Sequence, residues 1–145
     1  MSGAWNTIGV LALGALVWFV TYFVGRPIRD FYDLRREVIH KSLLYANVTA
    51  AVREFPRGSV EQVEISEEEM KRLQEAQNAF RDLSARMRAF ALNERLAVWV
   101  VKQQYDPWEA SEALLRVSNT LYKFGSDRAN AQSELERVLN FRITG

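Results

Sequence analysis

Glu37 and His40 lie within "EVIH" and have the Glu-x-x-His spacing of a metal-ligand pair. On a helix this spacing points both ligands toward one metal, and a di-metal bundle needs two such pairs with further carboxylates. His40 is the single histidine, so this chemistry would require a homodimeric metal-binding bundle. The helix phase places Glu37 and His40 opposite the apolar residues of the same segment. That placement favours a salt-bridged surface over a metal site.

Other sets of residues that carry chemistry are missing from the sequence. The chain has no cysteine, which excludes thiolate ligands and cysteine nucleophiles. No serine except Ser42 lies close to the histidine in sequence, and no glycine-rich phosphate loop is present. Basic and acidic residues nearly balance, at 19 and 18, without the basic excess of a nucleic-acid binder. We therefore expect no enzyme, no cofactor, no small-molecule substrate and no nucleic-acid partner.

The positioning elements begin with an uncharged stretch, "WNTIGVLALGALVWFVTYFV", which spans twenty residues. At a rise of about 1.5 Å per residue it is about 30 Å long, the thickness of a bilayer's hydrocarbon core. Trp5 stands at one end and Trp18 and Tyr22 near the other, as in an aromatic belt. The pattern predicts a transmembrane helix over residues 5–25. A buried soluble helix and a cleavable signal peptide are the alternatives, and the stretch lacks the basic flank of a signal peptide.

The charges that flank this stretch predict its orientation. Residues 1–4 contain no lysine or arginine, whereas Arg26 and Arg29 open a basic flank on the other side. By the positive-inside rule, residues 1–4 are extracytoplasmic and residues 26–145 form a cytoplasmic domain. The small size and simple architecture suggest a bacterial inner membrane. A spacer of opposite topology is an alternative that these charges disfavour.

The remaining chain predicts an all-α fold, a four- to five-helix bundle-like domain behind the single transmembrane helix. Apolar residues repeat every seven positions in one segment, which indicates a bundle seam: Leu73, Phe80 and Met87, with Ala76, Leu83 and Phe90. Asp106 and Pro107 mark a helix start. Residues 94–104 could form a helix or a buried strand, and we expect a helix. Pro27 predicts a hinge at "GRP". The expected helices cover residues 27–54, 67–92, 94–104, 107–124 and 127–141.

A row of basic residues is the candidate interaction surface. If one helix ran unbroken, four bases would lie seven residues apart along one line: Arg81, Arg88, Arg95 and Lys102. Such a row could contact anionic lipid or an acidic protein, or it could be a solvated helix face. Trp99 and Trp108 flank the end of the row. The core is the simpler interpretation for them, and a docking patch is the alternative.

These features predict a membrane-anchored protein-interaction module, such as an adaptor, an assembly factor or an accessory subunit. The expected partners are the membrane and a protein, which could be a second copy. One alternative is a lipid-surface module that lies flat on anionic lipid through the basic row and Trp99. The other is the metal-binding bundle that uses Glu37 and His40.

Overall fold

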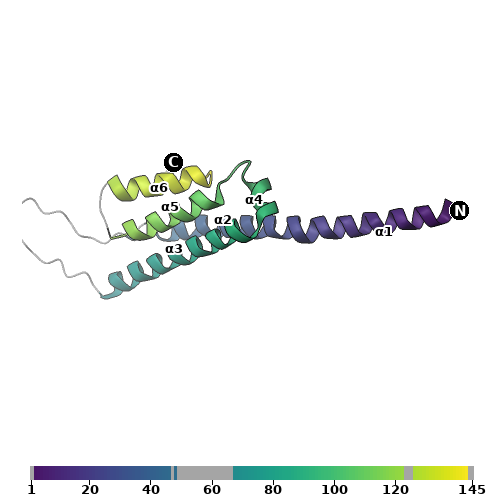
Figure 1. Ribbon diagram of the computed structural model, residues 1–145. Helices are drawn as coiled ribbons and strands as arrows, with labels where there is room; N and C mark the ends of the chain where they lie inside the picture. The colour runs from purple at the N-terminus through teal and green to yellow at the C-terminus, as the bar shows by residue number, and fades with distance from the viewer. Residues whose placement is uncertain (1, 47, 49–66, 123–125, 144–145) are drawn as a thin grey trace, which may run out of the picture.

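The computed structural model describes residues 2–46, 48, 67–122 and 126–143, with the side chains of residues 2–7 outside the description. Within these ranges every regular element is a helix and none is a strand. The helices after the first pack side by side as a bundle, and the first projects beyond them (Figure 1). The predicted all-α bundle with one long apolar N-terminal helix is confirmed.

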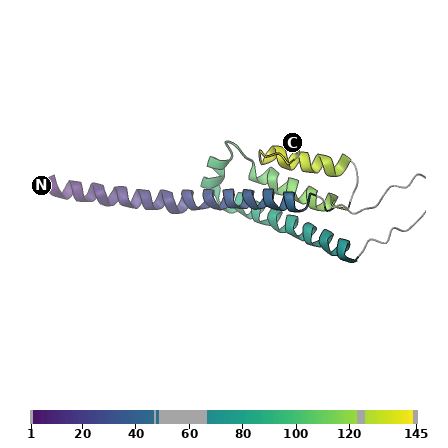
Figure 2. The ribbon, with the colours of Figure 1, turned by 180° about the vertical axis from the view of Figure 1, so that it is seen from behind.

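A single helical rod runs from the N-terminus into the bundle. It consists of α1 (Ser2–Val20), the π-helical segment η1 (Thr21–Gly25) and α2 (Arg26–Leu44). Every described side chain from Ile8 to Val20 is exposed, whereas α2 buries Phe31, Leu34 and Val38. Figure 2 shows α1 extending away from the bundle as the direct continuation of α2. The α1 half of the rod is therefore exposed, whereas the α2 half packs into the bundle.

The hinge that the sequence predicted at Pro27 is wrong. Gly25 has helical backbone angles, φ −65° and ψ −43°, and the N–H of Arg26 donates to the carbonyl of Thr21, five residues back. Proline lacks an N–H and its ring crowds the carbonyl four residues earlier in a regular α-helix. A π-helical turn adds one residue to the preceding turn. We attribute the continuity of the rod to this turn, which lets the chain pass the proline without breaking.

The bundle core forms between α3 (Glu67–Asn93) and α5 (Pro107–Thr120), which pack closely. All six seam positions predicted on α3 are buried. Small residues bring the two backbones together: the Ser84 hydroxyl donates to the carbonyl of Ser111 at 2.7 Å. The Ser118 hydroxyl donates to the carbonyl of Gln77 at 3.2 Å. Buried hydroxyls are thus satisfied across the interface, as buried polar groups require.

Asp106 caps α5 as its sequence signal predicted. Its carboxylate accepts hydrogen bonds from the N–H groups of Trp108 and Glu109, at 3.0 and 3.1 Å. The helix ends at Thr120, earlier than the predicted residue 124, and residues 123–125 lie outside the description. The last helix, α6 (Ser126–Val138), packs on α5 and ends before the predicted residue 141.

Two arginines link α2 and α6 reciprocally at their ends. Arg128 on α6 donates to the carbonyls of Val48 and Ala46, at 2.9 and 3.3 Å, just after α2 ends. Arg35 on α2 donates to the carbonyl of Leu139 at 2.9 Å and also to that of Asn140. Each side chain binds backbone carbonyls just after the C-terminal end of the other helix. Burial lowers the pKa of the Arg128 guanidinium below its usual value.

The end of α2 also differs from the prediction. The sequence predicted a helix to residue 54, but α2 ends at Leu44, and residues 47 and 49–66 lie outside the description. Asparagine and β-branched residues follow in "NVT", and these residue types lower helix propensity. Local sequence and the capping arginine together account for the earlier end.

Residues after α3 form a separate short helix, α4 (Arg95–Val101). The expected helix is confirmed over these residues, and the strand alternative is wrong. Glu94 interrupts the path with φ −103° and ψ 59°, so α4 restarts instead of continuing α3. Ala97 and Val101 face the core. α4 contacts η1 and α2 at the end of the bundle where α1 leaves it (Figure 1).

Candidate interaction surfaces

The break at Glu94 divides the predicted basic row into two surfaces. Arg81 and Arg88 remain on α3, whereas Arg95 and Lys102 move to α4 and the residue that follows it. The prediction of a continuous basic row is therefore wrong, because it required one unbroken helix. The core interpretation of the tryptophans is also wrong, since Trp99 is 72% exposed and Trp108 is 40% exposed. We call the two surfaces the α3–α5 face and the α4 face.

The α3–α5 face is a line of large apolar residues beside two arginines. Trp108, Leu115 and Tyr122 lie seven residues apart on α5 and the turn that follows it, and each is 40% exposed. The Tyr122 hydroxyl donates to the side-chain carbonyl of Gln77 on α3 at 3.3 Å. The Arg88 guanidinium lies 4.1 Å from the centre of the Trp108 ring. Arg81 belongs to the same helical row of α3 as Gln77 and Arg88.

The cations of this face lack carboxylate partners within the described residues. Arg88 contacts the indole of Trp108, and no acid lies within ion-pair distance of it or of Arg81. Two other arginines of the bundle do have acidic partners: Arg86 lies 2.9 Å from the carboxylate of Glu37, and Arg116 lies 2.8 Å from that of Glu134. The α3–α5 face therefore combines exposed apolar area with positive charge that no described acid neutralises.

The α4 face is apolar and lies at the opposite side of the break. Its members are the large, exposed hydrophobic residues of α4: Leu96, Trp99 and Val100. Arg95 is exposed beside them. At the end of α4, the Lys102 ammonium lies 3.5 Å from the Asp106 carboxylate that caps α5. Since α4 also buries apolar residues on its inner side, it is hydrophobic on both sides, which is unusual for a helix in water.

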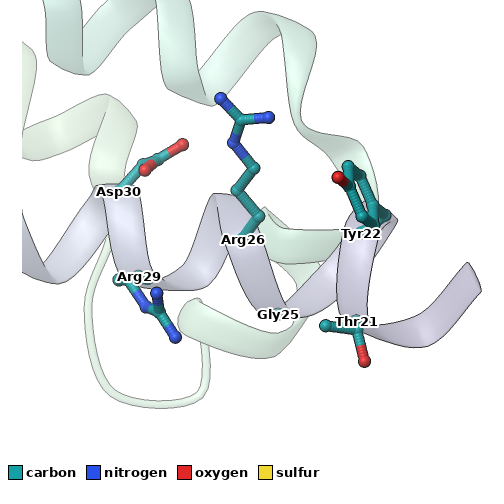
Figure 3. A pocket seen from close by; sticks show the side chains of 6 residues that line it. All are labelled: Thr21, Tyr22, Gly25, Arg26, Arg29 and Asp30. Carbon is teal, nitrogen blue, oxygen red and sulfur yellow. The ribbon is translucent and has the colours of Figure 1, made fainter. Parts of the chain in front are cut away.

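A shallow hollow of about 360 Å³ lies on the rod at the level of η1. It follows one side of the helix from Thr21 to Asp30 and passes over Gly25, which has no side chain to fill it. Figure 3 shows Tyr22, Arg26 and Asp30 pointing to one edge of the hollow and Thr21 and Arg29 pointing to the other. The hollow is open and is lined by one helix, so we regard it as part of the rod's surface and not as a ligand pocket.

The residues proposed from the sequence as a membrane anchor cluster at the same level, with one exception. The Trp18 and Tyr22 rings stack with centroids 5.1 Å apart, and both are exposed. Arg26 and Arg29 are exposed directly after them. The side chain of Trp5 lies outside the description. Aromatic and basic residues thus gather where the apolar helix ends.

Glu37 and His40 do not meet a third ligand in the described part of the chain. The Glu37 carboxylate binds the Arg86 guanidinium of α3, and His40 is exposed. No group of three potential metal-ligating side chains occurs among the described residues. Glu37 therefore joins α2 to α3 through an ion pair.

Sequence reasoning missed two members of the α3–α5 face, Leu115 and Tyr122. Their signal in the sequence is the seven-residue spacing that continues from Trp108. Leu96 and Val100 were also missed, because the continuous apolar run from Leu96 to Val101 does not show which of its residues face the core. Comparison with known protein families, with curated proteins and with solved structures finds no match for this chain.

Proposed function

We propose that this protein is a single-pass membrane-anchored interaction module. In this proposal α1 crosses the membrane with its N-terminus outside, and the bundle binds a protein partner through the α3–α5 face. The observation that carries the proposal is the rod: its apolar half is bare and its amphipathic half is the first helix of the bundle. A rod of this kind fixes the bundle directly to the anchor.

Support for the anchor comes from the length and exposure of the apolar helix. One helix among the described residues is long and apolar enough to cross a membrane, and none of its most apolar window is buried in the bundle. Exposed leucines and valines along α1 would carry a large hydrophobic cost in water. The basic residues after η1 support the orientation with the bundle in the cytoplasm.

Support for a protein partner comes from the composition of the α3–α5 face. Tryptophan, tyrosine and arginine are the residues that most often dominate interface energies. The spacing of Trp108, Leu115 and Tyr122 matches the repeat with which one helix packs along another. Arg81 and Arg88 lie beside this line without acidic partners in the described residues. The occupant that fits is an amphipathic helix whose flank carries acidic residues.

Site-specific photo-crosslinking in membranes tests this assignment. A photoreactive residue in place of Leu115 should yield a discrete protein adduct. Mass spectrometry should place the crosslink in a helical segment with acidic residues. The matched control is Asn130, an exposed position on α6, where the same probe should give little adduct. The double charge reversal Arg81→Glu and Arg88→Glu should remove the Leu115 adduct.

Three results contradict the proposal. Equal adducts from Leu115 and Asn130 would mean that the face has no selectivity. A crosslinked segment without acidic residues would remove the stated partner chemistry. Digestion of the bundle by protease added outside intact cells, without access to the cytoplasm, would overturn the orientation.

A further inference from the structure

We propose that α4 is a membrane foot: its exposed apolar face lies in the headgroup region of the bilayer that α1 crosses. The bundle then stands on the membrane through its α4 end. This inference rests on the proposed anchoring by α1 and adds a second lipid contact to it. The occupant of the α4 face is thus lipid, whereas the α3–α5 face remains free for protein.

The position of α4 along the rod is the first argument. α4 packs against η1, the segment in which the apolar part of the rod ends. Exposed aromatic residues of the rod, Trp18 and Tyr22, mark the same level. Aromatic belts of membrane helices lie at the headgroup region. A bilayer placed around α1 therefore has its surface at the height of α4 (Figures 1 and 2).

The composition of α4 is the second argument. Its inner side is occupied, since Ala97 and Val101 are buried and Val98 packs against the core. Its outer side exposes Leu96, Trp99 and Val100, and Trp99 is exposed to 72%. A helix that is apolar on both sides needs an apolar environment on both sides. The bundle supplies one, and the adjacent bilayer supplies the other.

The charges around the α4 face are the third argument. Arg95 is exposed at the start of α4, and Arg26 and Arg29 are exposed on the rod just after η1. Lys102 is also exposed beyond the end of α4, where its ammonium is 3.5 Å from Asp106. Basic residues around a small apolar patch are typical of interfacial helices, whose cations meet lipid phosphates while tryptophan and leucine enter the acyl boundary.

Three single-tryptophan versions of the full chain provide the test. Each version keeps Trp18, Trp99 or Trp108 and has phenylalanine at the other three tryptophan positions. The proteins are reconstituted into phosphatidylcholine–phosphatidylserine vesicles that contain lipids spin-labelled at shallow or deep positions. Circular dichroism of each version checks that the bundle is folded. Trp18 reports on the anchor, Trp99 on the foot, and Trp108 on the α3–α5 face outside the membrane.

We expect shallow labels to quench Trp99, with a depth of roughly 5–10 Å in the headgroup–acyl boundary. Trp18 should be quenched as well, and Trp108 should be quenched much less than either. Quenching of Trp18 without quenching of Trp99 overturns the foot and leaves the anchor in place. Quenching of neither overturns the anchor and the foot with it. Blue-shifted Trp99 emission without lipid quenching assigns the α4 face to a protein surface, such as a second copy, and also overturns the foot.

Discussion

Trp99 and Trp108, two exposed tryptophans on the helical bundle, stand in different surroundings. Trp108 is partly covered by the Arg88 guanidinium, and Tyr122 on the same face is hydrogen-bonded to Gln77. Trp99 is more exposed and lies among leucine and valine. A surface that is exposed to water until a protein partner binds has to be stable in water. The α3–α5 face meets this requirement better than the α4 face does. The bare α4 face suits an environment that is always apolar.

Both faces depend on the same hydrophobic core. The substitution with the largest expected effect is therefore one that destabilises this core and both faces with it. Leu114 is a fully buried residue of α5. Leu114→Ala should lower the free energy of unfolding by about 2–5 kcal/mol, because it leaves a cavity. Urea unfolding of the full chain in mild detergent measures this loss. The control Leu115→Ala removes a side chain that is 40% exposed, and should cost much less; equal losses would contradict the assigned core.

A charge in α1 should separate the two faces. Leu13 is exposed in the apolar half of the rod, far from the bundle core. Leu13→Arg should weaken insertion by about 2.5–3.5 kcal/mol, the cost of arginine at the centre of a transmembrane helix. Carbonate extraction of membranes should then release part of the protein, and lipid quenching of Trp99 should fall. The α3–α5 face should stay folded.

Leu115→Arg is the matched control for that experiment, since it places the same charge on the bundle surface. It should leave the protein in the membrane fraction and should reduce only the partner adduct. If Leu13→Arg remained fully membrane-bound, α1 would not be the anchor.

Replacing Trp108 or Trp99 with alanine tests the difference between the two faces through the free energy of unfolding. Trp108→Ala removes a half-covered indole and its contact with Arg88, and should cost roughly 1–2 kcal/mol of unfolding free energy. Trp99→Ala removes a side chain with few contacts inside the bundle and should cost less than about 0.5 kcal/mol. Urea unfolding of both variants in the same detergent provides the measurement. A larger loss at Trp99 would mean that α4 is part of the stabilising core.

The sequence predicted most of the fold because the seam of α3 and the cap of α5 are local signals. Leu73, Phe80 and Met87 repeat along one helix, and Asp106 acts on residues directly after it. The failures arose where an answer depended on a distant residue or on one dihedral angle. Arg128 caps the end of α2 from α6. No composition rule locates that contact, which joins residues far apart in the chain.

The candidate surfaces were harder to predict for a related reason. One residue, Glu94, leaves the helical region and moves Arg95 onto another surface than Arg88. The sequence does not reveal such a break, because the seven-residue spacing of the basic residues continues through it. The π-helical turn before Pro27 is the opposite case: a proline that predicted a break is absorbed within the helix. In both places the prediction was wrong because the backbone path differed from the one that the local sequence signal indicated.

Arg95 provides the smallest and most selective test of the division between the two faces. It is exposed beside Leu96 and has no carboxylate within ion-pair distance in the described residues. A base near an anionic membrane surface contributes about 1 kcal/mol. Arg95→Gln should therefore reduce the shallow quenching of Trp99 in vesicles that contain phosphatidylserine, and should have little effect in vesicles of phosphatidylcholine alone. Arg88→Gln removes the same charge from the α3–α5 face and should leave Trp99 quenching unchanged in both. If the two substitutions altered it equally, the charges of α3 and α4 would act on the membrane as one surface despite the break at Glu94.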